Sequence, residues 1–378
     1  MLRVEAAVDR TGMRQFVRFP WTLYADDRHW VAPLLLERRR FFDTRRNPFF
    51  KHADAAYFIA RRNGEIVGTI AAAVDQHYVA FHKEPIGYFG FFECRDDPDA
   101  AAALFDAAAA WLGARGMRTM RGPFNFTTNQ EIGLLVDAFD RDPVVLTTYN
   151  PAYYPGLYER CGLEKAKDLY AYWIDAGPPP PPLVEAAERV RQRSKVRITK
   201  MDTREYRREA RRVREIYNRA WSGNWGFVPL AEEEIEEMAR NLRLIADPDL
   251  ILFAFVEGEA EPVGFVICLP DLNQALKPLR GRLFPFGWWH LLRERRRIHF
   301  LRIFTLGVVP EHHPVGIGAL LYLETWQAGL RKGYTAGEMS WILEDNGPMN
   351  AALQMMNAHV YKTWRIYDRA LPADGGGP

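Results

Sequence analysis

The stretch that most constrains the fold lies between Phe300 and Gly333. Residues 300–309 are rich in apolar and β-branched side chains, which is typical of a strand buried on both faces. Pro310 ends this strand because proline cannot donate to a sheet ladder. From about Gly318 the apolar residues recur at helical spacing, and the pattern closes at Lys332 and Gly333 with a cation and a helix-ending glycine. The order strand, loop, helix predicts an α/β architecture.

Two glycines, Gly316 and Gly318, lie where the loop meets the predicted helix. Without a Cβ atom, such a loop lets successive backbone N–H groups converge on an anion at the positive end of the helix. The stretch is not the Gly-x-Gly-x-x-Gly of dinucleotide-binding folds, and no Gly-Lys-Ser/Thr follows as in a P-loop. The loop therefore predicts a different kind of site for a pyrophosphate.

Residues 313–318, His-Pro-Val-Gly-Ile-Gly, resemble the acyl-CoA loop of the GNAT N-acyltransferases, Arg/Gln-x-x-Gly-x-Gly/Ala, with His313 in the Arg/Gln position. A predicted strand at 337–343, the residues Glu-Asp-Asn at 344–346, a helix at 348–356 and a strand at 360–369 follow in the order of that family. The resemblance implies acyl-CoA as co-substrate. It implies CoA contacts at Val308, Val309, His313, Val315, Gly316, Ile317, Gly318, Ala319 and Asn346.

A carboxylate stands inside the strand predicted at 337–344. Period-two alternation places Glu338, Ser340 and Glu344 on one face of it. A buried carboxylate without a partner is costly, so Glu338 either pairs with an arginine or has a raised pKa and acts as general base. Both alternatives remain open from the sequence.

N-acyl transfer also requires a group that protonates the leaving thiolate. The tyrosine that the family often uses aligns here with Leu353, so this chain departs from the family pattern. Tyr361 and Tyr367 are the nearest substitutes. The predicted catalytic residues are Glu338, Ser340 and Tyr361.

The first half of the chain repeats the order hairpin, strand, helix, strand, helix, strand between residues 55 and 174, with Asn63-Gly64 as a two-residue hairpin turn. It resembles a second, degenerate GNAT copy. Where a CoA cradle would stand, it has carboxylates that repel a pyrophosphate; these are Glu93, Asp96, Asp97 and Asp99. We therefore expect a mixed α/β fold of two tandem GNAT-like lobes: a degenerate lobe at 1–177, an extended polyproline linker at 178–182 and an acyl-CoA-binding lobe at 183–378.

The second lobe is predicted to continue with a strand at 195–201, helices at 205–221 and 231–245, and a hairpin at 250–269. In the GNAT family the loop between those helices lies over the acceptor channel, which makes Asn224 and Trp225 candidate substrate contacts. Packing of Trp225 inside its glycine-bounded loop is an equal alternative. Asn129, in a polar insertion at 122–148, is a third candidate, unless that insertion is only a capped loop.

Residues 270–299 interrupt the second lobe with a segment that is both apolar and basic. Aromatic residues and arginines crowded together suit a membrane interface or a lipid tail, and the segment is too short to span a bilayer. We expect peripheral membrane contact through 280–297. The alternative is that the segment packs against the first lobe with its arginines in solvent.

Composition narrows the partners. A net charge of +2 over 378 residues provides no global attraction to nucleic acid, and the chain has no nucleic-acid motif. Three widely spaced cysteines suit a reducing compartment, and the histidines at 312, 313 and 359 lack a third ligand, so no metal is expected. No apolar leader or membrane span is recognised. These features predict a cytoplasmic protein, with peripheral contact at the inner face of the membrane as an open possibility.

The expected function is an acyl-CoA-dependent N-acyltransferase acting on a small or lipidic primary amine. Within the GNAT family the chain resembles two-lobed bacterial acyltransferases, some of which are similar to bacterial ceramide synthases, so a long-chain, sphingoid-like amine or a long-chain acyl-CoA is implied. The alternative is a CoA-binding regulatory or scaffolding protein that has lost turnover.

Overall fold

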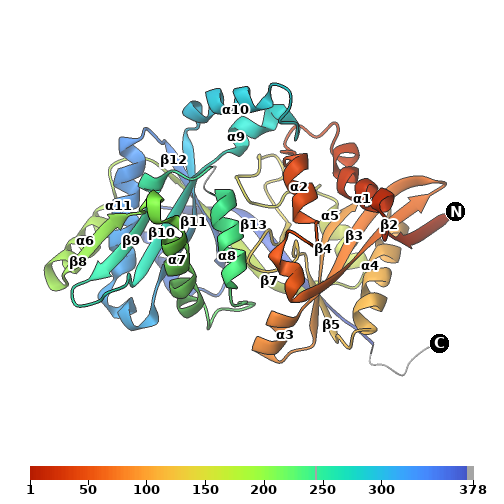
Figure 1. The fold of residues 1–378 in the computed structure, drawn as a ribbon, viewed down its shortest axis with the longest axis horizontal. Helices are drawn as coiled ribbons and strands as arrows, with labels where there is room; N and C mark the ends of the chain where they lie inside the picture. Colours follow the sequence, from red (N-terminus) through yellow and green to blue (C-terminus); the bar gives the residue numbers. More distant parts are fainter. Residues whose placement is uncertain (243–244, 373–378) are drawn as a thin grey trace. The chain divides into compact units, whose positions relative to one another are not determined.

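A computed structural model describes residues 1–242 and 245–372 of the chain (Figure 1). The chain divides into two compact units: unit 1 comprises Met1–Leu169, Arg280–Arg282 and the residues from Lys362 onward, and unit 2 comprises Tyr170–Leu279 and Leu283–Tyr361. The division falls inside two strands, β7 (Glu164–Asp175) and β13 (His359–Ala370). Residues 362–372 therefore lie in unit 1, whereas the boundaries expected at 177 and 183 assign them to the second lobe.

Unit 1 contains a mixed sheet in the order β1-β2-β3-β4-β5-β13, with the two-residue strand β6 beside β13. The strands β4 and β5 are parallel, and the other pairs of this order are antiparallel. Its elements are β1 (Leu2–Ala6), α1 (Arg10–Leu23), α2 (Leu35–Phe41), β2 (Ala53–Arg62), β3 (Glu65–Asp75), α3 (Gln76–His82), β4 (Ile86–Cys94), α4 (Pro98–Gly113), β5 (Thr119–Gly122), β6 (Leu134–Leu135) and α5 (Tyr154–Arg160).

The predicted hairpin is confirmed, because Asn63 and Gly64 adopt φ values of 54° and 91° between β2 and β3. Side chains of β3 alternate between the two faces of the sheet. Ile70 and Ala72 pack in the core beneath α4, whereas Ala71 packs with Phe16 of α1 on the other face. Unit 1 therefore has a helix on each face of its sheet.

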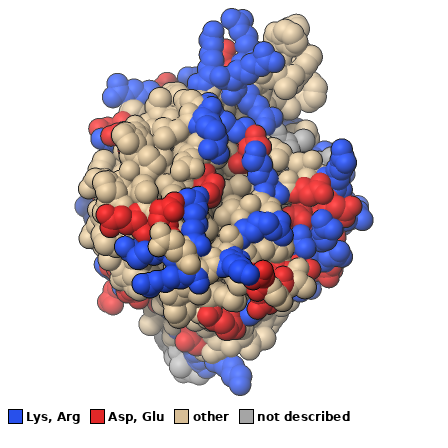
Figure 2. All heavy atoms as spheres, turned by 90° about the vertical axis from the view of Figure 1, so that its left-hand side faces the viewer, with Lys and Arg blue, Asp and Glu red and all other residues tan. Residues whose placement is uncertain are grey.

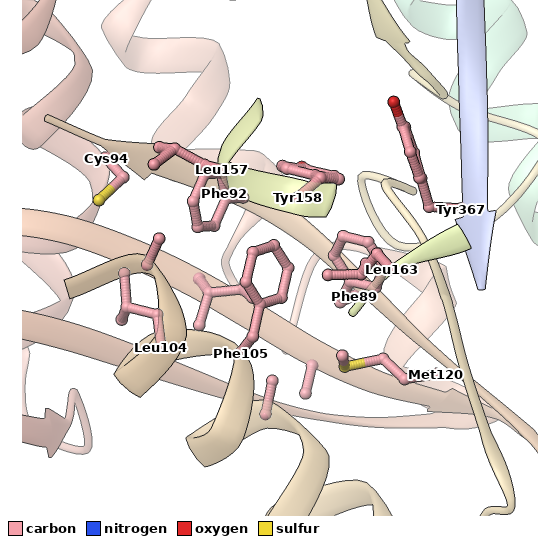
Figure 3. Packing of buried hydrophobic residues seen from close by; sticks show 14 of the residues in the cluster. Phe89, Phe92, Cys94, Leu104, Phe105, Met120, Leu157, Tyr158, Leu163 and Tyr367 are labelled. Atoms are coloured by element: carbon pink, nitrogen blue, oxygen red, sulfur yellow. The ribbon is translucent and has the colours of Figure 1, made fainter. Parts of the chain in front are cut away.

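The larger core of unit 1 is aromatic (Figure 3). Phe89 and Phe92 of β4 meet Phe105 of α4 and Tyr158 of α5, and the Phe92 and Phe105 rings stack at 4.7 Å between centroids. α4 begins at Pro98, because the Asp97 carboxylate accepts the Ala100 N–H and a proline is tolerated in the first helical turn. This core anchors the end of β4.

Unit 2 contains a sheet in the order β7-β12-β11-β10-β9-β8. The pair β11/β12 is parallel, whereas β8/β9, β9/β10 and β10/β11 are antiparallel. Its further elements are α6 (Pro181–Arg193), β8 (Val196–Lys200), α7 (Tyr206–Ala220), α8 (Glu232–Leu242), β9 (Ile251–Val256), β10 (Gly264–Pro270), α9 (Asn273–Leu276), α10 (Gly287–Glu294), β11 (Phe300–Val308), α11 (Ile317–Arg331), β12 (Ala336–Leu343) and α12 (Gly347–Met355).

The helices α6 and α11 pack together in one core with β12, whereas Trp221, directly after α7, packs on Phe265 and Gly307 of the sheet. The polyproline segment is not extended throughout, because Pro181 and Pro182 form the first turn of α6, where proline is tolerated. The strands and helices predicted in this half are confirmed. The helix predicted at 231–245 is described as far as Leu242; residues 243–244 lie outside the described residues, and residue 245 lies in a turn.

The interrupting segment folds into short helices, α9 and α10, between β10 and β11. Its residues Arg280–Arg282 belong to unit 1, where the Trp21 indole donates a hydrogen bond to the Arg280 carbonyl at 3.1 Å. Among the described residues, no helix combines the length and the hydropathy needed to cross a membrane.

Candidate functional site

The parallel strands β11 and β12 are paired along only part of their length. Their ladder runs from Phe300↔Ala336 to Ile303↔Met339, yet β11 continues to Val308 and β12 to Leu343. The side chains of β11 between residues 303 and 306 are only partly buried. Backbone polar groups need partners, so the stretch where these strands no longer pair offers hydrogen bonds to an inserted extended chain.

The loop at the end of β11 is a 3₁₀ turn at Pro310–Val315. The imidazole Nε2 of His313 lies 2.8 Å from the Val308 carbonyl oxygen, so this predicted CoA contact braces the loop against the strand that precedes it. Gly316 then adopts φ +82° and caps α11, which begins at Ile317. A left-handed residue at this point explains why the position carries glycine.

The N-terminus of α11 is open. No side chain caps it. The Gly316 and Ala319 N–H groups donate to the His313 and Gly316 carbonyls at 3.0 Å, so among the described residues of this turn the amides of Ile317 and Gly318 are the ones left for a ligand. A Cβ atom added at Gly318 would meet nothing nearer than Leu306 Cδ2 at 4.0 Å, and one at Gly316 would lie 3.5 Å from Val190. A helix N-terminus without a cap or steric cover fits a pyrophosphate group.

The other predicted CoA residues contribute in different ways. Val308, Val309 and Ile317 are buried, so they present backbone groups rather than side chains to a ligand. Val315 and Ala319 pack on the core between α6 and α11. The Asn346 side chain accepts the Met349 N–H at 3.2 Å and caps α12.

A buried polar cluster lies on β11, β12 and β13. Glu338 is fully buried, and its Oε1 accepts a hydrogen bond from Ser340 Oγ at 2.5 Å. The Tyr361 hydroxyl donates to the other carboxylate oxygen. Arg302 Nε donates to Ser340 Oγ at 3.1 Å and lies 3.9 Å from Glu338 Oε1. The three predicted catalytic residues therefore meet in one cluster, and Glu338 has the arginine partner that one alternative expected.

Burial governs the ionisation of this cluster. It lowers the pKa of Arg302 to about 10, although Glu338 acts in the opposite direction, so the guanidinium remains a cation at neutral pH. Burial, followed by the charge of Glu338, raises the pKa of Tyr361 above its ordinary value, so the phenol keeps its proton. Glu338 thus faces a cation and two hydroxyl donors.

Aromatic rings surround the polar cluster. The Trp173 ring lies 5.4 Å from the Tyr361 ring, and the Arg302 guanidinium lies 4.8 Å from the Trp341 ring centroid. The carboxyl of Asp271, directly after β10, is also buried and acts on both Arg302 and Tyr361. Sequence reasoning did not single out Arg302, although it is the one charged residue in the strand Phe300–Val308.

The predicted acceptor contacts lie in separate units. Asn224 and Trp225 are partly buried in the turn after α7, whereas Asn129 belongs to unit 1, in the segment after β5. Trp221 was missed by sequence reasoning. Its ring lies so close to β11 that a Cβ atom at Gly307 would be 2.3 Å from it. A lone glycine inside a strand often marks such an approach, and Gly307 was the available signal.

The other two positions weighed for the thiolate-protonating acid, Leu353 and Tyr367, hold side chains that pack in hydrophobic cores. Leu353, which takes the place of the family's tyrosine, is fully buried in the core with α6 and α11. Tyr367 packs in the core of unit 1. Among the tyrosines weighed from the sequence, Tyr361 is therefore the one that contacts Glu338.

No family model matches the chain. Solved structures show its fold. A tandem GNAT protein from the clavulanic acid biosynthesis pathway superposes with a TM-score of 0.55 at 12% identity, covering 98% of this chain and 99% of the other. A GCN5-related N-acetyltransferase from Sphaerobacter thermophilus gives 0.52 at 13% identity, covering 98% and 96%. The predicted mixed α/β fold of two GNAT-like lobes is confirmed.

Two relatives that match nearly the whole chain show the family to which it belongs. It is 36% identical to the bacterial ceramide synthase of Caulobacter vibrioides over 95% of both chains, and 35% identical to Protein YghO of Escherichia coli over 97% of this chain and 95% of that protein. The chain belongs to the family of these two bacterial proteins.

Proposed function

We propose that this protein is an N-acyltransferase that moves an acyl group from acyl-CoA to a primary amine with a long hydrocarbon chain. The observation that carries the proposal is the arrangement along β11. An uncapped glycine-bearing helix N-terminus follows one end of the strand, and the Glu338 cluster lies near its other end. An anion site and a buried proton acceptor therefore lie along the same pair of strands, β11 and β12, which stop pairing part of the way along. This arrangement suits a long cofactor that binds by its pyrophosphate and reacts at its thioester end.

The CoA pyrophosphate is proposed to bind the amides of Ile317 and Gly318, where the helix dipole also favours negative charge. Val308 lies six positions beyond Arg302 along β11, which is about 20 Å at the rise of a strand. An extended pantetheine arm spans a separation of this order. The backbone groups of β11 and β12 beyond their shared ladder would pair with its amides.

The proposed chemistry is a direct attack of the amine on the thioester carbonyl. The C–N bond forms, the C–S bond breaks, and a proton passes from the amine nitrogen to Glu338. Tyr361 gives its hydroxyl proton to the leaving thiolate and regains one from Glu338 through the hydrogen bond between them. The cluster then returns to its starting state with CoA and an amide as products.

The relatives support a lipidic acceptor. One of them is named a ceramide synthase, and a ceramide is the amide of a long-chain amino alcohol. The aromatic wall around Glu338, made of Trp173, Trp341 and Phe300, suits a substrate with an apolar chain. Within unit 2, Asn224 and Trp225 after α7 are the proposed acceptor contacts.

A free-thiol assay across acyl-CoAs and amines tests the proposal. We expect thiol release that depends on a long-chain amino alcohol and that disappears in Gly318→Glu. Release that depends on no amine, or that survives in Gly318→Glu, would contradict it.

Two observations favour a second candidate, a CoA-binding protein without turnover. The position of the family's tyrosine is the buried Leu353, and Glu338 is held by Arg302 as in a structural ion pair. Calorimetric binding of CoA without thiol release from any acyl-CoA and amine pair would support this candidate over the enzyme.

A further inference from the structure

The interrupting segment exposes large apolar side chains in unit 2. Phe284 is 72% exposed, Phe286 79%, Trp288 46%, Trp289 63% and Leu292 58%. Soluble proteins rarely gather so many aromatic side chains at the surface within nine residues without a partner for them. The other large exposed apolar side chains described in unit 2 are scattered; these are Leu330, Met355 and Val360.

The same segment is basic. Residues 283–297 contain four arginines and one glutamate, a net charge of +3. Arg293 and Arg297 are 68% and 67% exposed, and Arg295 and Arg296 are also exposed. Figure 2 shows lysine and arginine side chains gathered at the top of the molecule beside a protruding group of uncharged atoms. The exposed aromatic residues and these arginines form what we call the aromatic-arginine surface.

The aromatic-arginine surface matches one class of partner. Tryptophan prefers the boundary between water and lipid, and arginines just beside it bind anionic headgroups. The helix α10 has eight residues, which is far too short to cross a bilayer but suits a position in its interface. Charge complementarity and aromatic content together favour an anionic membrane over an uncharged or acidic protein surface.

The segment connects β10 to β11 and so joins the aromatic-arginine surface to the strand that carries the candidate site. The chain leaves the sheet after Pro270, passes the buried Asp271, and returns at Phe300, whose carbonyl accepts the Asp271 N–H at 3.1 Å. Arg302, which contacts the Glu338 cluster, lies two residues later. The segment is therefore joined to the end of β11 that holds the polar cluster, opposite the end followed by Gly316.

We propose that the aromatic-arginine surface docks unit 2 onto an anionic membrane. The aromatic side chains enter the interfacial layer, and the arginines contact phosphate headgroups. Docking would present a long-chain amine to the Glu338 end of β11. This role rests on the function proposed above. The binding itself requires no acyl transfer, so a protein without turnover would still dock.

Co-sedimentation of the full-length protein with vesicles tests the proposal. One set contains phosphatidylglycerol and phosphatidylcholine, and the other phosphatidylcholine alone. We expect binding to the anionic vesicles at least tenfold tighter than to the neutral ones, and a loss of at least tenfold for Trp288→Ala with Trp289→Ala. Each arginine near an anionic surface contributes roughly fivefold, so Arg295→Gln with Arg296→Gln and Arg297→Gln should cost roughly a hundredfold.

Matched variants separate this surface from general stickiness. Leu330→Ala with Met355→Ala removes exposed apolar side chains elsewhere in unit 2, and Arg189→Gln with Arg193→Gln and Arg219→Gln removes the same charge elsewhere. Both should bind vesicles within about twofold of the parent. Equal losses in these controls would overturn the proposal, and so would a parent protein that binds no vesicles. A parent dimer that dissociates in Trp288→Ala with Trp289→Ala would also overturn it and would assign the surface to a second copy of the chain.

Discussion

The ends of β4 in unit 1 and β11 in unit 2 occupy the same place in two copies of one fold. The helices that follow these two strands begin in different ways. After β11 the chain forms a turn around Gly316, and α11 starts without a side-chain cap. After β4 the Asp97 carboxylate caps α4 and binds Arg62 through two hydrogen bonds of 2.7 Å. One helix N-terminus is open to an anion, and the other is already occupied by a carboxylate.

The strand pairs beside these helices differ in the same sense. In unit 1 the parallel ladder of β4 and β5 also ends early, after Tyr88↔Arg121, but the chain fills the gap with its own backbone. Phe124 donates its N–H to the Phe89 carbonyl at 2.7 Å, and a Cβ atom at Gly90 would lie 1.8 Å from the Phe124 oxygen. In unit 2 the β11/β12 ladder ends after Ile303↔Met339, and among the described residues no backbone segment fills the space beyond it in this way.

Polar residues occur at corresponding positions of the two ladders. Arg121, opposite Tyr88 in unit 1, binds the Asp368 carboxylate with two hydrogen bonds of 2.8 and 2.7 Å. Glu338, opposite Arg302 in unit 2, binds Arg302, Ser340 and Tyr361. Both units therefore have a paired charge on the third rung of the ladder, and in unit 2 the strands separate beyond it.

The acid at the end of β4 is not where the sequence prediction placed it. Glu93 was expected to face the phosphate position, but its carboxylate accepts hydrogen bonds from Tyr24 at 2.7 Å and Tyr154 at 2.9 Å. The Tyr154 hydroxyl also accepts the Cys94 N–H, and Tyr153 donates to the Cys94 carbonyl. Side chains of unit 1 itself therefore close this end of β4, and repulsion by acids is not the only obstacle to CoA.

The largest expected effect concerns the open helix. Gly318→Glu places a side chain and a negative charge among the amides of α11, and the loss of two hydrogen bonds to a charged group weakens CoA binding on the order of a thousandfold. Calorimetry with acetyl-CoA measures it. Gly113→Glu is the matched control, because Gly113 ends α4 in unit 1 without a positive φ and with no atom within 4 Å of its Cβ position, so this change should leave affinity unchanged. Wild-type stoichiometry should be one CoA per chain; two would break the comparison between the units.

The second prediction concerns the paired charges. Glu338→Gln should lower kcat on the order of a hundredfold, because the proton acceptor is lost, and leave CoA affinity unchanged. Steady-state kinetics per folded molecule measures this effect. Normal turnover together with a large loss of thermal stability would instead show an ion pair that only stabilises the fold. Tyr361→Phe should lower kcat as well, since it removes the proposed acid without removing the partner of Arg302.

The third prediction concerns stability in unit 1. Burial raises the pKa of Glu93 from 4.5 to about 7, so the folded state retains a proton that the unfolded chain loses. Stability from this group is present below pH 4.5 and is lost as the pH rises toward 7, by about 2 kcal/mol once partial exposure is allowed for. Denaturant titrations of Glu93→Gln should show a smaller fall than the wild type between pH 5 and 7. Asp99→Asn, whose carboxyl is 82% exposed, should keep the wild-type slope.

The smallest expected effect separates a cap from a CoA contact. Asn346→Ala removes the side-chain cap of α12 and should lower the free energy of unfolding by about 1 kcal/mol. If Asn346 only caps the helix, CoA affinity stays unchanged. Asn346→Asp keeps the capping oxygen and should restore stability. A fall in CoA affinity in the alanine variant would return Asn346 to the cofactor contacts.

The sequence by itself determined the elements around the glycine loop and the first hairpin, whereas α6 was not predicted. Hairpin turns, helix caps and the strand before Gly316 are set by local rules, such as the positive φ of Asn63-Gly64, the cap at Asp97 and the glycine at the start of α11. Periodicity also placed Glu338 and Ser340 on one face, because side chains of a strand alternate. These signals act over a few residues, so a single sequence contains them in full.

Only the tertiary structure decided the partners. Arg302 reaches Ser340 and Glu338 through the parallel register of two strands separated by a helix, and Tyr361 reaches Glu338 from β13; no local pattern contains such a register. Tertiary packing likewise turned Glu93 inward and filled the β4–β5 gap with Phe124. Burial and long-range pairing set which of two similar strand ends stays open, because both depend on residues far apart in the chain.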